Sequence, residues 1–174
     1  MVLAAALAAC GGPGVKSDWE RQHEQQLVPR EEPVVLPAYP GKRELIEFTV
    51  DAAGGFRFFI DPASLSVGSD GEVRYVLVAR SAQGVENVSF EGMRCNSAEL
   101  RLYALGRGGA WTGMSGEWRS MRERSAQRWQ LTLFREFFCP LKDPITNVRE
   151  GIQALRDGGH PALKGLTRDI PRGF

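Results

Sequence analysis

The amino-acid sequence predicts an α+β fold, in which an antiparallel β-sheet meander is packed by one or two C-terminal helices and closed by one disulfide. Three observations predict this fold. Short apolar stretches between tight-turn signals fill residues 44–107, and apolar residues at helical spacing follow in the last third of the chain. Cys95 and Cys139 remain as a pair because Cys10 is expected to have a separate role.

The composition is that of an ordinary folded protein with little net charge. The chain has 174 residues, of which 43% are hydrophobic and 25% charged, so it can form a core. Lys and Arg total 22 against 21 Asp and Glu, which gives a net charge of +1. No global field therefore draws the protein to nucleic acid or to an anionic membrane, and a charged partner must meet a local patch.

The chain opens with a short apolar segment that ends on a cysteine. Val2–Ala9 are eight apolar residues in a row, below the ~20 that span a bilayer and typical of a signal-peptide core. The letters LAAC at 7–10 resemble the bacterial lipobox, so we expect residues 1–9 to be a signal peptide and Cys10 to carry lipid. No Lys or Arg precedes the run, so the n-region is truncated and we expect the natural start to lie upstream. The alternative is a chance Ala-rich terminus with a free cysteine.

Residues 10–41 are predicted to form a proline-rich spacer behind the lipidated cysteine. Its prolines stand at positions 13, 29, 33, 37 and 40. Proline at this density favours extended, polyproline-like chain. Trp19 and the letters LPAYP at 36–40 are apolar exceptions that offer contacts for docking the spacer. We expect the folded domain to comprise residues 42–159 and a C-terminal tail to comprise 160–174.

Five stretches have the pattern of β-strands. They are residues 44–50, 56–62, 72–81, 85–95 and 99–107. Pro62 is expected to stop the second strand, and Asp70-Gly71 predicts a hairpin turn because this pair supplies positive φ. Residues 72–81, EVRYVLVARS, alternate most clearly between two faces. One face has Val73, Tyr75, Leu77 and Ala79, and the other has Arg74, Val76, Val78 and Arg80.

Two helices are predicted near the C-terminal end. Residues 127–138, QRWQLTLFREFF, place five large apolar side chains at helical spacing, although Leu131 also suits a strand, and Pro140 is expected to end the helix. Asn147 and Glu150 have the spacing of a capping box. The stripe that follows, which should pack on the sheet, is Val148, Ile152 and Leu155.

Cys95 and Cys139 are predicted to form a disulfide. If Cys10 carries lipid, these two are an even pair in an oxidising compartment, where disulfides persist. They are 44 residues apart, and closing such a loop stabilises a fold by about 4 kcal/mol on the chain-entropy model. The alternative is two separate buried thiols. Neither His23 nor His160 neighbours a cysteine at ligand spacing, so we expect no metal site.

Several of these motifs together resemble a known family. They are LPAYP, LIEF, FFIDPASLSVGSDGEVRYVLVARS, ENVSFEGMRC, WR at 118–119 and FFCP at 137–140. Over residues 36–159 the chain resembles the cryptic neisserial protein one-like (CNP1-like) family of proteobacterial lipoproteins. The resemblance implies a periplasm-facing lipoprotein with an uncharacterised domain and no assigned activity. The layout is more loosely similar to surface-adhesin E-like domains, and such an analogy does not carry function.

The sequence contains no catalytic motif, so we expect a protein that is not an enzyme. It has no P-loop, no nucleophile elbow and no zinc-binding His-Glu-x-x-His. Its two histidines offer no general base of the usual kind. Asp61 is expected in a turn at the end of a strand, and Glu86 and Glu91 at solvated strand positions. No cofactor is expected.

One local charge feature lies in residues 118–129, WRSMRERSAQRW. Its candidate ligand-binding residues are Trp118, Arg119, Arg122, Arg124 and Arg128. Arginine beside aromatic rings suits phosphate, carboxylate or sugar surfaces, which makes an anionic glycan or lipid, or an acidic envelope protein, the candidate partner. The alternative is a solvated basic loop whose tryptophans anchor the core.

These observations predict an outer-membrane lipoprotein that faces the periplasm and acts as a binding or assembly-accessory module. Gly11 after the cysteine resembles lipoproteins that are sorted to the outer membrane. The lipid would attach the protein to the membrane, and we expect no nucleic-acid partner in that compartment. The alternative is a surface-exposed, adhesin-like lipoprotein that binds host or matrix ligands. The sequence does not indicate an oligomeric state.

Overall fold

A computed structural model describes residues 17–18, 33–41, 44–51, 53–113, 116–122 and 126–165. Contacts divide the chain into two units, Met1–Glu31 and Glu32–Phe174. In the first unit only Ser17 and Asp18 are described, and both are exposed. The expected signal peptide and the lipidated Cys10 lie outside the described residues. Within the described ranges, no helix has the length and apolar character needed to cross a membrane.

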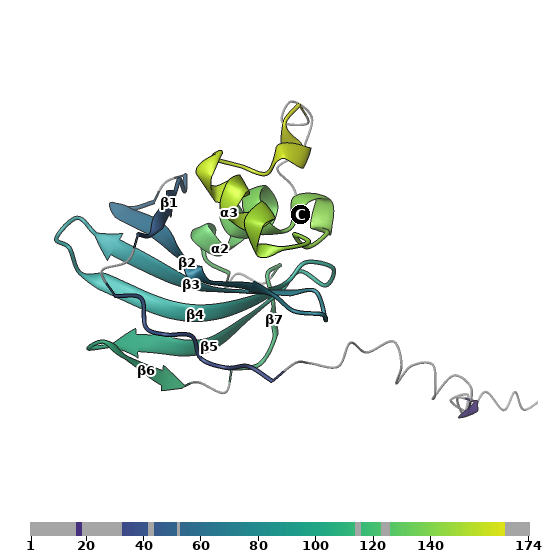
Figure 1. Cartoon of the computed structure of the whole chain (residues 1–174), viewed down its shortest axis with the longest axis horizontal. Coiled ribbons are helices and arrows are strands. Elements are labelled where there is room, and N and C mark those ends of the chain that lie inside the picture. The colour runs from purple at the N-terminus through teal and green to yellow at the C-terminus, as the bar shows by residue number, and fades with distance from the viewer. Residues whose placement is uncertain are drawn as a thin grey trace, which may run out of the picture. The chain divides into compact units, whose positions relative to one another are not determined.

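The second unit is built on an antiparallel sheet of seven strands, six of which pair in chain order (Figure 1). These are β1 (Ile46–Phe48), β2 (Phe56–Val67), β3 (Glu72–Ser81), β4 (Glu86–Arg94), β5 (Glu99–Arg107) and β6 (Ala110–Gly113), while β7 (Arg119–Ser120) pairs with β5. The predicted meander is confirmed. So is the hairpin at Asp70-Gly71, where Gly71 has a φ of 77° and the Asp70 carboxylate accepts a hydrogen bond from the Glu72 N–H at 3.0 Å.

Strand β2 does not stop at Pro62, so this prediction is wrong. The register between β2 and β3 shifts between Asp61 and Ser66, and Pro62 lies in that irregularity, where no ladder hydrogen bond from its nitrogen is needed. The Asp61 carboxylate accepts from the Ala63 N–H at 3.0 Å, and the Ser64 hydroxyl donates to the Asp61 carbonyl at 2.7 Å. These local bonds have the turn chemistry expected of Asp61, although they lie within the strand and Asp61 itself is fully buried.

A helical layer covers one face of the sheet (Figure 1). It contains α2 (Arg128–Thr132), a π-helical segment η1 (Leu133–Phe138), a 3₁₀ turn η2 (Pro140–Lys142), α3 (Val148–Arg156) and a 3₁₀ turn η3 (Pro161–Leu163). Both predicted helices are confirmed. The first of them is α-helical in α2 and continues as a π-helix in η1. The Asn147 side chain caps α3 by accepting from the Glu150 N–H at 3.0 Å. The Glu150 carboxylate bonds Thr146 rather than the cap residue, so the capping box is only half formed.

The sheet buries side chains on both faces, as the alternation in residues 72–81 predicts. Val73, Tyr75, Leu77 and Ala79 pack with the helical layer, and Val76 and Val78 belong to a second cluster on the other face. The segment 33–41 runs across this second face (Figure 1). Trp111 Nε1 donates to the Pro37 carbonyl at 2.8 Å, and the Tyr39 and Trp111 rings lie 5.1 Å apart. A Cβ on Gly106 would lie 2.8 Å from the Tyr39 ring, so glycine makes room for this contact.

The predicted disulfide between Cys95 and Cys139 is present. Both residues are buried, and their Cα atoms are 5.3 Å apart. The bond joins the residue after β4 to the residue after η1. It therefore fastens the helical layer to the sheet.

Candidate binding groove

The helical layer leaves part of its sheet face open, and this part forms a groove of about 620 Å³. Strands β2 to β5 form the floor, and residues at the start of α2 form one wall. Floor residues include Phe58, Leu77, Ala79, Ser89, Leu102 and Leu105. The volume is within the roughly 300–1,000 Å³ of known ligand pockets, and the lining is mostly apolar, as in such pockets.

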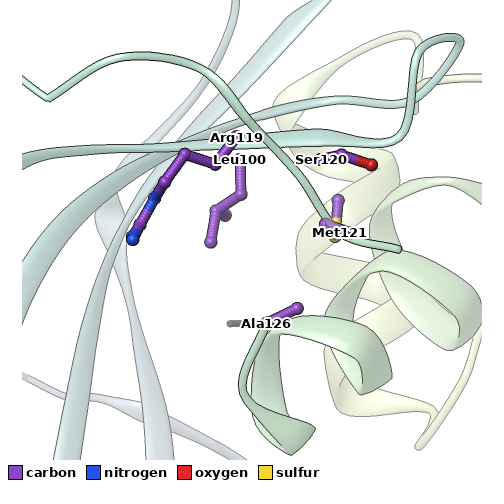
Figure 2. Close-up of a pocket in the computed structure, with 5 residues that line it drawn as sticks. All are labelled: Leu100, Arg119, Ser120, Met121 and Ala126. Atoms are coloured by element: carbon purple, nitrogen blue, oxygen red, sulfur yellow. The ribbon is translucent and has the colours of Figure 1, made fainter. Parts of the chain in front are cut away.

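A second hollow beneath β7 is too small for a ligand. Leu100, Met121 and Ala126 line it, and its volume is about 10 Å³, the space of one water molecule (Figure 2). Figure 2 also shows the Arg119 side chain extending away from Met121, with Leu100 between them in this view. The larger groove is therefore the candidate site.

Stacked aromatic rings join the floor of the groove to its wall on the α2 side. The Trp129 ring from α2 and the Phe58 ring from β2 lie 5.1 Å apart at an interplanar angle of 25°. Beside Phe58, the floor has the small side chains of Ala79 and Ser89. Small residues beside large ones on a sheet leave space above the strands, and the groove occupies such a space.

A buried carboxylate, Glu91, lies at the base of the groove. It is 3% exposed, so the solvated position expected for it is wrong. Its carboxylate accepts from the Ser89 hydroxyl at 2.7 Å, the Tyr75 hydroxyl at 3.1 Å and the Gln130 amide at 3.1 Å. Burial raises the pKa of Glu91, and these three hydrogen bonds and the positive charge of Arg119 only partly oppose that shift.

Gln130 links Glu91 to the start of α2. Its amide nitrogen donates to Glu91, and its amide oxygen accepts from the Gln127 N–H at 2.9 Å. Both ends of this side chain are therefore used, and the start of α2 is fixed above the floor of the groove. Glu86, which was expected at a solvated position like Glu91, is exposed and pairs with Arg80 at 2.7 Å.

The stability of the fold should depend on pH through Glu91. A raised pKa in the folded state means that the contribution of Glu91 is fully present below the unfolded value of about 4.3 and is lost as pH rises through the folded value. We expect the free energy of unfolding of the wild type, relative to Glu91→Gln, to fall as pH rises above about 4.3. Urea unfolding at a series of pH values measures this difference.

The matched control is Glu86→Gln, which removes an exposed glutamate from the same strand. A difference between the wild type and Glu91→Gln that stays constant with pH, or that grows in favour of the wild type, would contradict the assignment.

Of the four candidate ligand-binding residues that the structure describes, Arg119 alone lines the groove. Arg122 is exposed in the turn after β7, Arg128 is exposed at the start of α2, and Arg124 lies outside the described residues. Trp118 contacts other arginines, with the Arg94 guanidinium 4.0 Å and the Arg101 guanidinium 5.8 Å from its ring. Arg119 is therefore the candidate ligand-binding residue that the structure places at the groove.

A second polar cluster is buried on the other face of the sheet. The Glu72 carboxylate pairs with Arg74 at 2.9 Å and accepts from the Tyr103 hydroxyl at 2.6 Å. Gly92 lies against this pair, and a Cβ there would be 2.1 Å from Glu72 Oε1. Glu72 thus binds both Arg74 and Tyr103 within the protein, and we assign the cluster a structural role. In the parts of the chain that are described, no three His, Cys, Asp or Glu side chains gather as metal ligands.

The fold and the groove define a class of protein: a small, disulfide-closed α+β domain with an open apolar groove on the helical face of its sheet. The chain belongs to the CNP1-like family, whose family model matches residues 24–156. The family expected from the motifs is therefore confirmed. Searches of curated proteins and of solved structures found no match.

Proposed function

We propose that this CNP1-like protein is a non-enzymatic binding module of the bacterial cell envelope, and that the groove holds a mainly apolar ligand. The open groove of about 620 Å³ carries the proposal. Its floor presents leucine and aromatic side chains, and open apolar surface of this kind marks ligand or partner sites. The apolar part of the ligand would lie on this surface and be removed from water there.

The sequence and the disulfide support an envelope location. The letters LAAC at 7–10 resemble a lipobox, and a disulfide such as Cys95–Cys139 persists in oxidising compartments such as the periplasm. On this proposal the protein is an outer-membrane lipoprotein that faces the periplasm. Lipid on Cys10 attaches it to the membrane, and its ligand comes from the envelope rather than from nucleic acid.

Filling the groove should abolish binding of an apolar probe. Asn87 is exposed and lines the groove, so Asn87→Trp adds a large ring there without disturbing the core. We expect the wild type to bind the neutral dye N-phenyl-1-naphthylamine saturably, and Asn87→Trp to lose at least about tenfold in affinity, as a ligand does when its apolar contacts are removed. Fluorescence titration measures both.

The control is Val85→Trp, because Val85 is 61% exposed in the adjacent hairpin and does not line the groove. This variant should bind the dye like the wild type. Equal binding by all three proteins, or the same loss in both variants, would overturn the groove as the binding site.

Intact mass of the protein purified from its native membrane tests the location. We expect a lipid-sized increase at Cys10, and no alkylation of Cys95 or Cys139 until reductant is added. Cys10→Ser is the control and should leave the membrane fraction. An unmodified Cys10 with alkylated Cys95 and Cys139 would show a reducing compartment and contradict the proposal.

A further inference from the structure

We infer that the occupant of the groove is a single-chain anionic amphiphile, whose alkyl chain lies on the apolar floor and whose anionic head is bound by Arg119 at the rim. This inference rests on the proposed function and names the ligand class for the same groove. It follows from three features: the apolar floor, the internal satisfaction of the buried polar groups, and the position of the one cation.

The floor favours an alkyl chain. Leu77 and Ala79 come from β3 and Leu102 and Leu105 from β5, so apolar side chains lie on both sides of β4, which contributes Ser89 and Glu91 between them. Leu77 pairs with Ser89, and Ser89 with Leu105, which places these three side chains on the same face. A flexible chain of methylene groups can follow this surface and remove it from water.

The polar groups at the base of the groove already have hydrogen-bond partners within the protein. Glu91 already accepts three hydrogen bonds, from Tyr75, Ser89 and Gln130. Gln130 uses its own oxygen to accept from the Gln127 N–H. A glycan would bring many hydroxyl groups into this space, and each would need a partner that these residues do not offer. The groove therefore favours an apolar chain over a sugar.

Arg119 supplies the charge that selects the head group. It lies on β7, its side chain is exposed, and it is the one Lys or Arg among the described residues that line the groove. No hydrogen bond of its guanidinium occurs among the described residues. A guanidinium binds a carboxylate or a phosphate through two parallel N–H donors and repels an ammonium group. Charge complementarity thus selects an anionic head at this end.

A matched set of amphiphiles tests the inference. The set is dodecanoate, dodecanol and dodecyltrimethylammonium, which share one chain and differ in the charge of the head. Each competes with N-phenyl-1-naphthylamine below its micelle concentration. We expect the wild type to prefer dodecanoate over dodecanol by about tenfold or more, as for a charged hydrogen bond.

Arg119→Gln should abolish this preference while it still binds the dye and dodecanol. Arg122→Gln, which removes an exposed arginine outside the groove, should keep the preference. Arg119→Glu should shift the preference to the ammonium amphiphile, and this reversal cannot result from a loss of folding. Asn87→Trp should bind no member of the set.

The outcomes separate the two proposals. If no amphiphile and no dye binds, the proposed function fails. If all three amphiphiles bind the wild type equally, or if Arg119→Gln keeps the preference, the proposed function is supported, but the inference that the ligand has an anionic head is overturned. If Asn87→Trp binds dodecanoate like the wild type, the amphiphile lies elsewhere, as it would in an interface between two copies, and the inference is overturned.

Discussion

Reduction of the Cys95–Cys139 disulfide is expected to lower the free energy of unfolding by about 4 kcal/mol. The bond closes a loop of 44 residues, so cutting it returns that loop's conformational freedom to the unfolded chain. Both cysteines are buried, and reduction leaves their volume in place, so the folded state loses little packing. Urea unfolding with and without reductant measures the effect.

The double variant Cys95→Ala and Cys139→Ala provides the control for reduction. It should not respond to reductant, and it should unfold at a urea concentration no higher than that of the reduced protein, because it also lacks two buried sulfur atoms. A loss below about 1 kcal/mol would contradict the expectation, because it would mean that the unfolded chain is equally compact without the bond.

Glu72→Ala is expected to lower the free energy of unfolding by about 3 kcal/mol or more. Glu72 is 1% exposed, and its carboxylate holds both the Arg74 guanidinium and the Tyr103 hydroxyl. Without it, the buried Arg74 still has the Asp70 carboxylate at 3.7 Å, a longer contact than the 2.9 Å pair with Glu72. Removing one partner of a buried pair is costly because the other charge stays out of water.

An exposed pair of the same kind is the control. Glu47 and Arg57 pair across β1 and β2, and their side chains are 45% and 62% exposed. Glu47→Ala should cost less than about 1 kcal/mol, because water screens this pair. Equal losses in the two variants would show that burial does not determine the strength of the Glu72 pair.

Much of the fold could be predicted from local patterns. The alternation in residues 72–81 indicated both faces of β3, because a strand that is buried on each face still places its side chains in a period of two. Asp70-Gly71 and Asn147 indicated a turn and a helix start, since both depend on backbone chemistry within a few residues.

The features that sequence patterns missed depend on distant partners. Glu91 looked solvated because its partners Tyr75 and Gln130 are 16 and 39 residues away. Strand β2 passes Pro62 because Asp61 and Ser64 supply bonds that composition does not indicate. The groove was also missed, because its extent depends on how much of the sheet the helices cover.

Arginines that are close together in residues 118–129 lie on different elements of the structure. In the described part of residues 118–129, a strand, a turn and the start of a helix hold Arg119, Arg122 and Arg128 respectively, so different elements position these three arginines. Arg119 reaches the groove from β7, whereas Arg128 lies on α2. Closeness in sequence indicated the charge of the site but not which residue supplies it.

The short edges of the sheet limit how this protein can aggregate. Strand β1 has three residues, and β6, at the other end of the order, has four. An edge strand offers unpaired backbone groups on which a foreign strand can nucleate, and edges this short offer very few. Strands β3 and β4 are paired on both sides, and where β2 runs beyond the three residues that pair with β1, Pro62 and the register shift after Asp61 interrupt its edge. Neighbouring copies of the domain therefore have few unpaired backbone groups with which to extend the sheet into a fibril, even though the groove on the sheet face stays open.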